Sequence, residues 1–447
     1  MTLRRSSPPA LALAFLAGLA ACTPYYARPT DHEQRALVRA QVAKAEGDVA
    51  GACSELAAAA VGDVHPSLLI AYARCLMDPA AGTPDLDRAR AVLERAYALP
   101  SPRRGRAALW LAQLERQRGA PPQAQIVWLE RARRLGEPGT ERLLVKAWAQ
   151  EPETYRAQLI DAYERTATTD PYSALELARL VAADPAVDPA IVRTRGLAAV
   201  RALEVGARAG NGAQARTLAW LYRSGELVPQ DQERAQSWLA VAAKAGDPKA
   251  QRKLAERAQA EGDDDTASRW LEQAVGGGDT TAAVALSQGL LSGRYRTVSP
   301  EGEDALARLA GSTAPPELAL AYGNLLLARS SGRFDPEAGL ALLERAAARG
   351  HPPAQAELGR RLLRGQSVPS DPDRGLTLLE TAADADDAGA MFHLARAYLN
   401  GQGIGRDPPL GMDWLRRAAQ AGSRGAREEL ARHTGEAATG PADIASG

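Results

Sequence analysis

The sequence predicts an all-α protein, a right-handed α-solenoid of stacked helical hairpins. The first observation is a repeat of fixed length, because Leu358, Leu394 and Leu430 follow one another in steps of 36 residues. The second is composition, since only 3 Phe and 4 Met occur among 447 residues and helix-favouring Ala, Leu, Arg and Glu dominate. A fixed period in this range is typical of repeats that bury their apolar faces only against neighbouring repeats.

The N-terminus reads as a targeting segment. Two arginines precede an apolar stretch, residues 11–19, that is too short to span a membrane comfortably. Leu-Ala-Ala-Cys follows at 19–22 and resembles the lipobox of bacterial lipoproteins, whose cysteine thiol receives the lipid. The resemblance implies a lipoprotein signal peptide over 1–21, lipidation of Cys22 and a lipidated tether over 22–30. The alternative is an ordinary secretory signal with an incidental cysteine.

The residue after the lipidated cysteine indicates the membrane to which the protein is sorted. Thr23, and not Asp, follows Cys22. By resemblance to the sorting rule of enteric bacteria, this favours an outer-membrane protein that is lipid-anchored and faces the periplasm. Acyl chains would make such an anchor stable, since each buried methylene adds about 0.8 kcal/mol.

Two cysteines, Cys53 and Cys75, remain in the mature chain. An even pair in an oxidising compartment invites a disulfide, and adjacent helices would bring the two residues within range. Two buried thiols that act as small apolar groups are the alternative. Neither interpretation makes the cysteines catalytic.

Residues 31–209 read as degenerate hairpins of the tetratricopeptide (TPR) type. Apolar residues recur at three- and four-residue steps, and turn sequences such as Glu-Pro-Gly at 137–139 separate the helices. The predicted helices cover 31–46, 48–61, 66–77, 85–98, 103–118, 121–135, 139–149, 152–168, 171–183 and 188–209.

Residues 210–432 form regular units. Each first helix ends in a glycine that favours a left-handed C-cap, and an aspartate begins the second helix. Large residues should meet inside each hairpin, as Leu358 with Leu378 and Leu394 with Trp414. The stretch "AMFHLARAYLNGQGIGRDPPLGMDWLRRAAQAG" resembles the Sel1-like subfamily of TPR repeats. The tail, 433–447, has no apolar period and is predicted to be disordered.

Charge and motifs exclude several functions. Lys plus Arg and Asp plus Glu both number 54, so no net field draws the chain to nucleic acid. No two of the five histidines have the spacing of a metal site or of a base beside a nucleophile, and His393 aligns with polar surface positions. The acidic run 263–265 suits a cation or, alternatively, a solvated turn. We therefore predict no enzymatic activity, no metal and no cofactor.

The remaining candidates for a functional site are surface residues that could bind a partner. Trp220 stands where other units have charged residues, and it is either an exposed anchor for a partner or a contact with the preceding degenerate repeat. Arginines on first-helix faces form either a basic stripe for an acidic partner or an ordinary solvated face; they are Arg360, Arg361, Arg364 and Arg396.

The combination of lipobox, degenerate TPR half and Sel1-like half is similar to the AlgK-type family of alginate-secretion lipoproteins. The two stretches in which this resemblance is found are "SGELVPQDQERAQSWL" and "SGRYRTVSPEGEDAL". The resemblance implies a scaffold for exopolysaccharide secretion, with an outer-membrane β-barrel exporter and periplasmic polymer-modifying proteins as partners. Two alternatives are a polysaccharide- or peptidoglycan-binding module and a regulatory adaptor of an envelope enzyme or signalling receptor.

Overall fold

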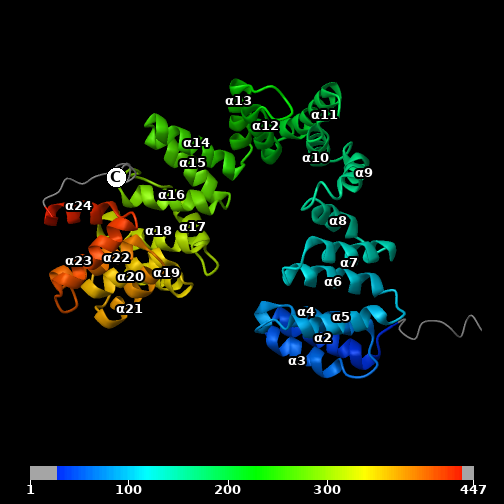
Figure 1. Ribbon diagram of the computed structural model, residues 1–447, viewed down its shortest axis with the longest axis horizontal. Coiled ribbons are helices and arrows are strands. Elements are labelled where there is room, and N and C mark those ends of the chain that lie inside the picture. Colours follow the sequence, from blue (N-terminus) through cyan, green and yellow to red (C-terminus); the bar gives the residue numbers. More distant parts are fainter. Residues whose placement is uncertain (1–27, 435–447) are drawn as a thin grey trace, which may run out of the picture. The chain divides into compact units, whose positions relative to one another are not determined.

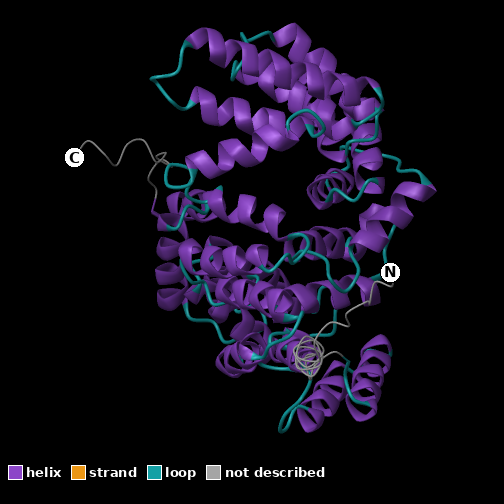
Figure 2. Ribbon diagram, turned by 90° about the vertical axis from the view of Figure 1, so that its right-hand side faces the viewer, coloured by secondary structure: helices purple, strands orange, loops and turns teal. Residues whose placement is uncertain are grey.

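The computed structural model describes residues 28–434. The predicted signal peptide, Cys22, most of the tether and nearly all of the tail lie outside these residues. Within them the chain is helical, without a strand, and consecutive helices pair as hairpins (Figures 1 and 2). The predicted all-α solenoid is thereby confirmed. None of the described helices combines the length and the apolar character that a membrane crossing needs.

The chain divides into two compact units, with the boundary between residues 199 and 200, inside helix α11. The predicted helix over 152–168 is shorter than expected and begins only at Arg156, because residues 152–155 form turns. The helices up to the boundary are α2 (Asp31–Ala45), α3 (Val49–Ala59), α4 (Pro66–Leu76), α5 (Leu86–Ala98), α6 (Arg104–Gln117), α7 (Pro122–Arg134), α8 (Thr140–Trp148), α9 (Arg156–Thr166), α10 (Pro171–Ala182) and α11 (Pro189–Arg208), with a short 3-10 helix η1 (Pro79–Ala81).

The first unit packs its hairpins through small and leucine side chains. Leu68 of α4, Leu93 of α5 and Leu111 of α6 are fully buried in one apolar cluster that begins at α2. Cys53 of α3 and Cys75 of α4 are joined by a disulfide, with their Cα atoms 5.4 Å apart. The covalent link therefore ties the first hairpin to the second.

The second unit contains the regular repeats. Its closely packed hairpins are α12–α13, α14–α15, α18–α19, α20–α21 and α22–α23, whereas α17 packs mainly on α15 and α16 packs mainly on α18. The helices are α12 (Gly212–Ser224), α13 (Gln232–Lys244), α14 (Pro248–Glu261), α15 (Asp264–Gly276), α16 (Thr280–Leu291), α17 (Pro300–Leu309), α18 (Pro316–Leu327), α19 (Pro336–Ala348), α20 (Pro352–Arg364), α21 (Pro372–Asp384), α22 (Ala388–Asn400), α23 (Pro408–Gln420) and α24 (Arg424–Thr434), with a 3-10 helix η2 (Arg329–Ser331).

The predicted caps are confirmed in most repeats, whereas α16 and α18 end at Ser292 and Ala328 and Ser299 caps α17. The aspartates before α19, α21 and α23 each accept a hydrogen bond from the amide three residues later, and Pro occupies the first helical position. Gly225, Gly365 and Gly401 end first helices in the left-handed conformation. A residue with a side chain would be strained there. The caps thus fix where each hairpin turns.

Within the hairpins the two helices approach through glycine. A Cβ added to Gly359 of α20 would lie 2.7 Å from the carbonyl oxygen of Gly375 in α21. Gly323 and Gly339 face each other in the same way one repeat earlier. The predicted large residues flank this contact, since Leu358 and Leu378 share one apolar cluster. The close approach explains why the repeat needs small residues beside its leucines.

Candidate functional site

The candidate site of the second unit is a groove around Trp220. The indole is 38% exposed on α12, whereas Tyr222, two residues later, is buried as predicted. Leu239 and Gln236 of α13 line the groove, and Arg252 of α14 lines its other wall. The hollow has a volume of about 350 Å³. We call it the Trp220 groove. A partly exposed indole in a hollow of this size suits an apolar side chain of a partner.

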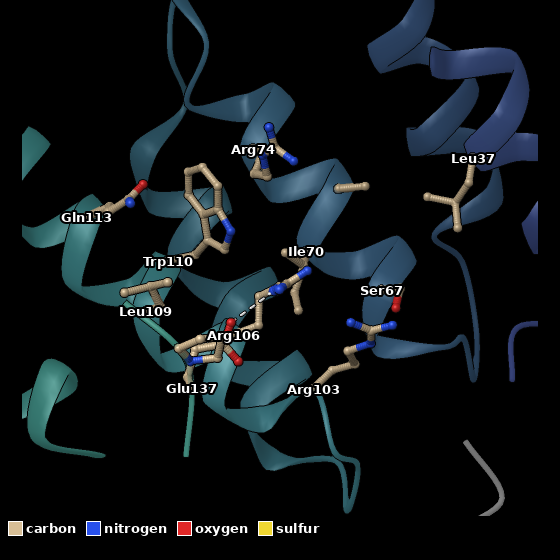
Figure 3. A pocket seen from close by; sticks show the side chains of 12 residues that line it. Leu37, Ser67, Ile70, Arg74, Arg103, Arg106, Leu109, Trp110, Gln113 and Glu137 are labelled. Carbon is tan, nitrogen blue, oxygen red and sulfur yellow. Dashed lines mark hydrogen bonds and ion pairs between the residues drawn. The ribbon is translucent and has the colours of Figure 1, made fainter. Parts of the chain in front are cut away.

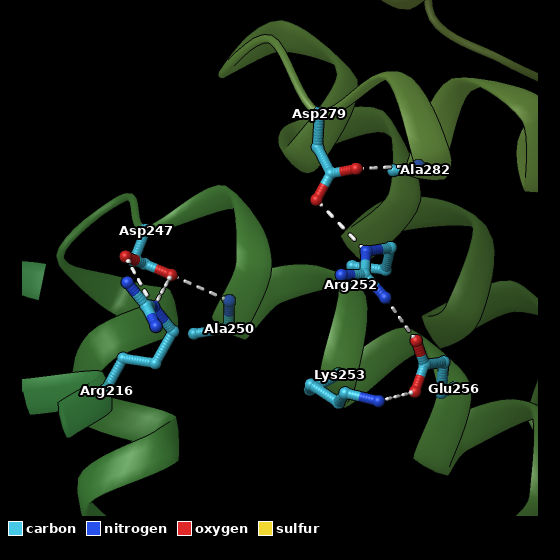
Figure 4. Close-up of polar contacts among 8 residues, drawn as sticks. All are labelled: Arg216, Asp247, Ala250, Arg252, Lys253, Glu256, Asp279 and Ala282. Atoms are coloured by element: carbon cyan, nitrogen blue, oxygen red, sulfur yellow. Dashed lines mark hydrogen bonds and ion pairs between the residues drawn. The ribbon is translucent and has the colours of Figure 1, made fainter. Parts of the chain in front are cut away.

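The walls of the groove are fixed by a repeated polar contact (Figure 4). Asp247 caps α14 by accepting a hydrogen bond of 2.8 Å from the amide of Ala250. Its carboxylate also accepts from Nε of Arg216, on the preceding first helix α12, at 3.1 Å. The Asp247 side chain is only 8% exposed and that of Arg216 38%. One carboxylate therefore both begins a helix and ties it to the preceding repeat.

The same contact recurs one repeat later (Figure 4). Asp279 caps α16 through the amide of Ala282 and accepts from Nε of Arg252 at 3.0 Å. Glu256 binds Arg252 and Lys253 from within α14. Although burial alone would lower it, the pKa of Arg252 is raised by its bonds to these carboxylates. The guanidinium is thus held charged and immobile at the groove wall.

Six cationic side chains line the rim of the Trp220 groove. Four of them are paired with carboxylates outside the lining, as Arg257 is with Glu261 at 2.7 Å. Charges at the rim of a site mainly steer a partner of opposite sign and fix its register. The cations are Arg216, Arg223, Lys249, Arg252, Lys253 and Arg257.

The four arginines predicted as a basic stripe do not have equal surroundings. Arg360 and Arg361 both bind the carboxylate of Glu357 at 2.6 Å, and their side chains are 16% and 9% exposed. Burial alone would raise the pKa of Glu357, but these two arginines hold it below its usual value. Arg364 is exposed, and Arg396 is 40% exposed. Because Arg396 also lies 3.8 Å from Glu429, Arg364 is the arginine of the four that is most available to a partner.

His393 differs from the polar surface position expected for it. Its Nδ1 is out of contact with water and has no hydrogen-bond partner. Burial, followed by the positive charge of Arg360, lowers the pKa of His393 to about 4. Arg364 and Arg396 act in the same direction, and Glu357 opposes them. The imidazole is therefore neutral at neutral pH and belongs to the packing between α20 and α22.

The acidic run at 263–265 has a structural explanation. Asp263 caps α15 by accepting from the amide of Thr266 at 3.0 Å, and this bond lowers the pKa of the carboxyl. Asp264 and Asp265 lie in the first turn, where the helix dipole favours negative charge. In the part of the chain that the structure describes, no three His, Cys, Asp or Glu side chains gather as a metal site would require.

A second hollow lies in the first unit around Trp110, which sequence reasoning did not single out (Figure 3). The irregular period of residues 31–209 hides which faces of the helices are exposed. The sequence nevertheless indicated an exposed surface here. Arg106, Trp110 and Gln113 lie on one face of the helix, and none of the three is aliphatic.

Comparison with known proteins identifies a repeat family that matches most of the regular units. The Sel1 repeat family model matches residues 217–247, 304–351, 352–387 and 388–423, about a third of the chain. These residues therefore form Sel1 repeats. The predicted resemblance is confirmed at this level, and the alginate-secretion family is not part of what matches. No curated protein matches the chain.

Several solved structures are similar in fold. A Sel1 repeat protein from Oxalobacter formigenes is 21% identical, with 76% of this chain and 89% of that chain covered and a TM-score of 0.41. The protective antigen c5321 of uropathogenic Escherichia coli, which displays an SLR fold, is 18% identical, with 86% and 90% covered and a TM-score of 0.44. A putative Sel1 repeat protein from Klebsiella pneumoniae is 22% identical, with 43% and 95% covered and a TM-score of 0.30.

Proposed function

We propose that this chain is a non-enzymatic, lipid-anchored scaffold that faces the periplasm and holds envelope proteins together for alginate-type exopolysaccharide biosynthesis and export. The observation that carries the scaffold role is the Trp220 groove, an exposed indole between cationic walls on a Sel1-type solenoid. Proteins built from Sel1 repeats generally mediate protein–protein interactions, and repeat scaffolds of this kind are typically non-catalytic. Solenoids bind through surface residues that depart from the repeat, as Trp220 does.

The groove has the features of an interaction hot spot. Trp and Arg are enriched among the residues whose truncation weakens protein complexes most, and rigid side chains lose little entropy on binding. Arg216 and Arg252 are held by the caps of the following helices, so the groove is formed before a partner arrives. Partners of the proposed kind are an outer-membrane β-barrel exporter and periplasmic polymer-modifying proteins.

The address is part of the proposal. The lipobox at 19–22 supports an anchor on Cys22, and Thr23 supports the outer membrane. The disulfide between Cys53 and Cys75 is compatible with an oxidising compartment such as the periplasm. Replacement of Cys22 by Ser should release the protein from the outer-membrane fraction, and a variant that still fractionates there would contradict lipidation at this residue.

Affinity capture of the full-length lipoprotein from detergent-solubilised envelopes tests the scaffold role. We expect it to retain a β-barrel exporter or polymer-modifying proteins. The Trp220→Ala variant should bind them about thirtyfold more weakly, since truncation of a hot-spot residue costs about 2 kcal/mol or more. Leu410→Ala is the matched control, because Leu410 is 37% exposed in the same unit but lies outside the groove. Equal losses in both variants would contradict the assignment.

One observation favours a second candidate function. The cations around Trp220 would also suit an acidic polysaccharide, whose sugars stack on exposed indoles. Capture of glycan without any protein would support that polysaccharide-binding module and overturn the scaffold proposal.

A further inference from the structure

The first unit contains a groove that no part of the proposed function uses. A hollow of about 520 Å³ lies between α2, α4, α6 and the turn before α8 (Figure 3). A neighbouring hollow of about 380 Å³ shares Arg74, Trp110 and Gln113 with it. Together they make one continuous groove along the first helices of three successive hairpins. We call it the Trp110 groove.

Each helix presents a single face to this groove. Ser67, Ile70 and Arg74 lie three to four residues apart on α4, and Arg106, Trp110 and Gln113 do so on α6. Side chains at these spacings share one side of a helix. The opposite sides of the same helices carry the buried leucines of the core. The groove is therefore a permanent surface of the stacked hairpins and needs no rearrangement to form.

The groove carries an excess of positive charge. Of its five cations, Lys44 binds Asp78 at 2.9 Å and Arg106 binds Glu137 at 3.1 Å. These two carboxylates are the acidic residues of the lining, so three cations are left over. The three are Arg74, Arg103 and Arg116, all exposed and without a carboxylate in ion-pairing range among the described residues.

The floor of the groove is apolar, and its composition favours an aliphatic side chain over a sugar as the ligand. Leu37, Leu109 and the indole of Trp110 are partly exposed along it. The guanidinium of Arg74 lies 4.7 Å from the centre of the Trp110 ring, over its face (Figure 3). A sugar needs an open aromatic face for stacking, and the Arg74 guanidinium covers one face of this ring. An aliphatic side chain needs only the leucines and the ring edge.

We propose that the Trp110 groove binds an acidic peptide segment of a partner protein. The carboxylates of the segment pair with Arg74, Arg103 and Arg116, and an aliphatic side chain packs against Leu37 and Leu109. Complementary charge raises the rate of encounter and fixes the register, and the apolar contact supplies affinity. The inference gives the solenoid a second protein-binding surface and does not rest on the export pathway.

Selection of random phage-displayed peptides on the full-length protein in detergent tests the proposal. We expect peptides rich in Asp and Glu with at least one Leu, Ile or Val, and binding that weakens as salt rises. By fluorescence anisotropy, Arg103→Glu and Arg116→Glu should each weaken a selected peptide about tenfold. Both residues are exposed, so the variants should keep the helical circular dichroism of the parent.

Two controls locate the binding. Arg134→Glu makes the same charge change on the exposed side of α7, outside the groove, and should leave peptide affinity unchanged. Trp220→Ala should also leave it unchanged, which separates this groove from the proposed scaffold site. Enrichment of neutral or basic peptides, undiminished binding by the two groove variants, or displacement of the peptide by an oligogalacturonate would each overturn the inference.

Discussion

Removal of the Asp247 side chain should loosen the junction between two repeats of the second unit. In the parent protein its carboxylate accepts from the amide of Ala250 and from Nε of Arg216. Asp247→Ala removes the cap of α14 and the link to α12 in one change. Asp231 offers a matched control, because it caps α13 through Arg234 N at 2.9 Å without linking two repeats.

The magnitude follows from the two contacts. An N-cap aspartate contributes about 1 kcal/mol, and a hydrogen bond to a charged group contributes about 1.5–3 kcal/mol. Because the Arg216 side chain is 38% exposed, water can partly replace its partner, which favours the lower figure. We therefore expect Asp247→Ala to cost about 2.5 kcal/mol and Asp231→Ala about 1 kcal/mol. Asp247→Asn should fall between them, since Asn caps as well as Asp.

Amide hydrogen exchange is the suitable assay, because stability in a repeat array is local and one global free energy does not describe it. The free energy of opening should fall for amides of α12 to α14 and remain unchanged in α20 to α24. A double-mutant cycle with Arg216→Ala should give a coupling energy of about 1–2 kcal/mol. A coupling near zero, or equal costs for the variants at 247 and 231, would refute the reasoning.

Three further predictions concern packing, pH and the covalent link. Gly359→Ala should cost about 1–3 kcal/mol in chemical unfolding, because its Cβ would lie 2.7 Å from a carbonyl oxygen of α21, while Gly405→Ala, with open space, should be neutral. Since the pKa of His393 is lowered to about 4, the native state binds fewer protons than the unfolded state, whose histidine has a pKa near 6.5. Stability should thus be full above about pH 6.5 and fall towards pH 4 by at most about 3 kcal/mol, a dependence that His393→Leu removes. Replacement of Cys53 and Cys75 by serine opens a link across a sequence separation of 22 and should cost about 3 kcal/mol in the first unit.

Local chemistry is what the sequence could predict. The leucines spaced by 36 residues, the glycine C-caps and the aspartate N-caps depend on residues close in sequence or on a fixed period. These features appear in the structure. The pairing of Arg361 with Glu357 was also detectable, because charges four residues apart on a helix are neighbours. Reading the arginines as one stripe overlooked this local neutralisation.

Contacts between repeats were harder to predict. Asp247 and its partner Arg216 are 31 residues apart in the sequence. Their meeting depends on how one hairpin stacks on the next, which periodicity alone does not give. Exposure is similar: the position of Trp220 showed that it departs from the repeat, but the groove depends on side chains of α13 and α14. The Trp110 groove was hidden because its repeats lack a regular period.

Site-specific photo-crosslinking in living cells tests the proposed scaffold role most directly. A benzoylphenylalanine at Gln236 would sit in the Trp220 groove, and one at Lys244 would be exposed on the same helix outside it. We predict a protein adduct from position 236 that disappears in the Trp220→Ala background, and none from position 244. Equal adducts from both positions, an adduct indifferent to Trp220→Ala, or no protein adduct at 236 would contradict the account.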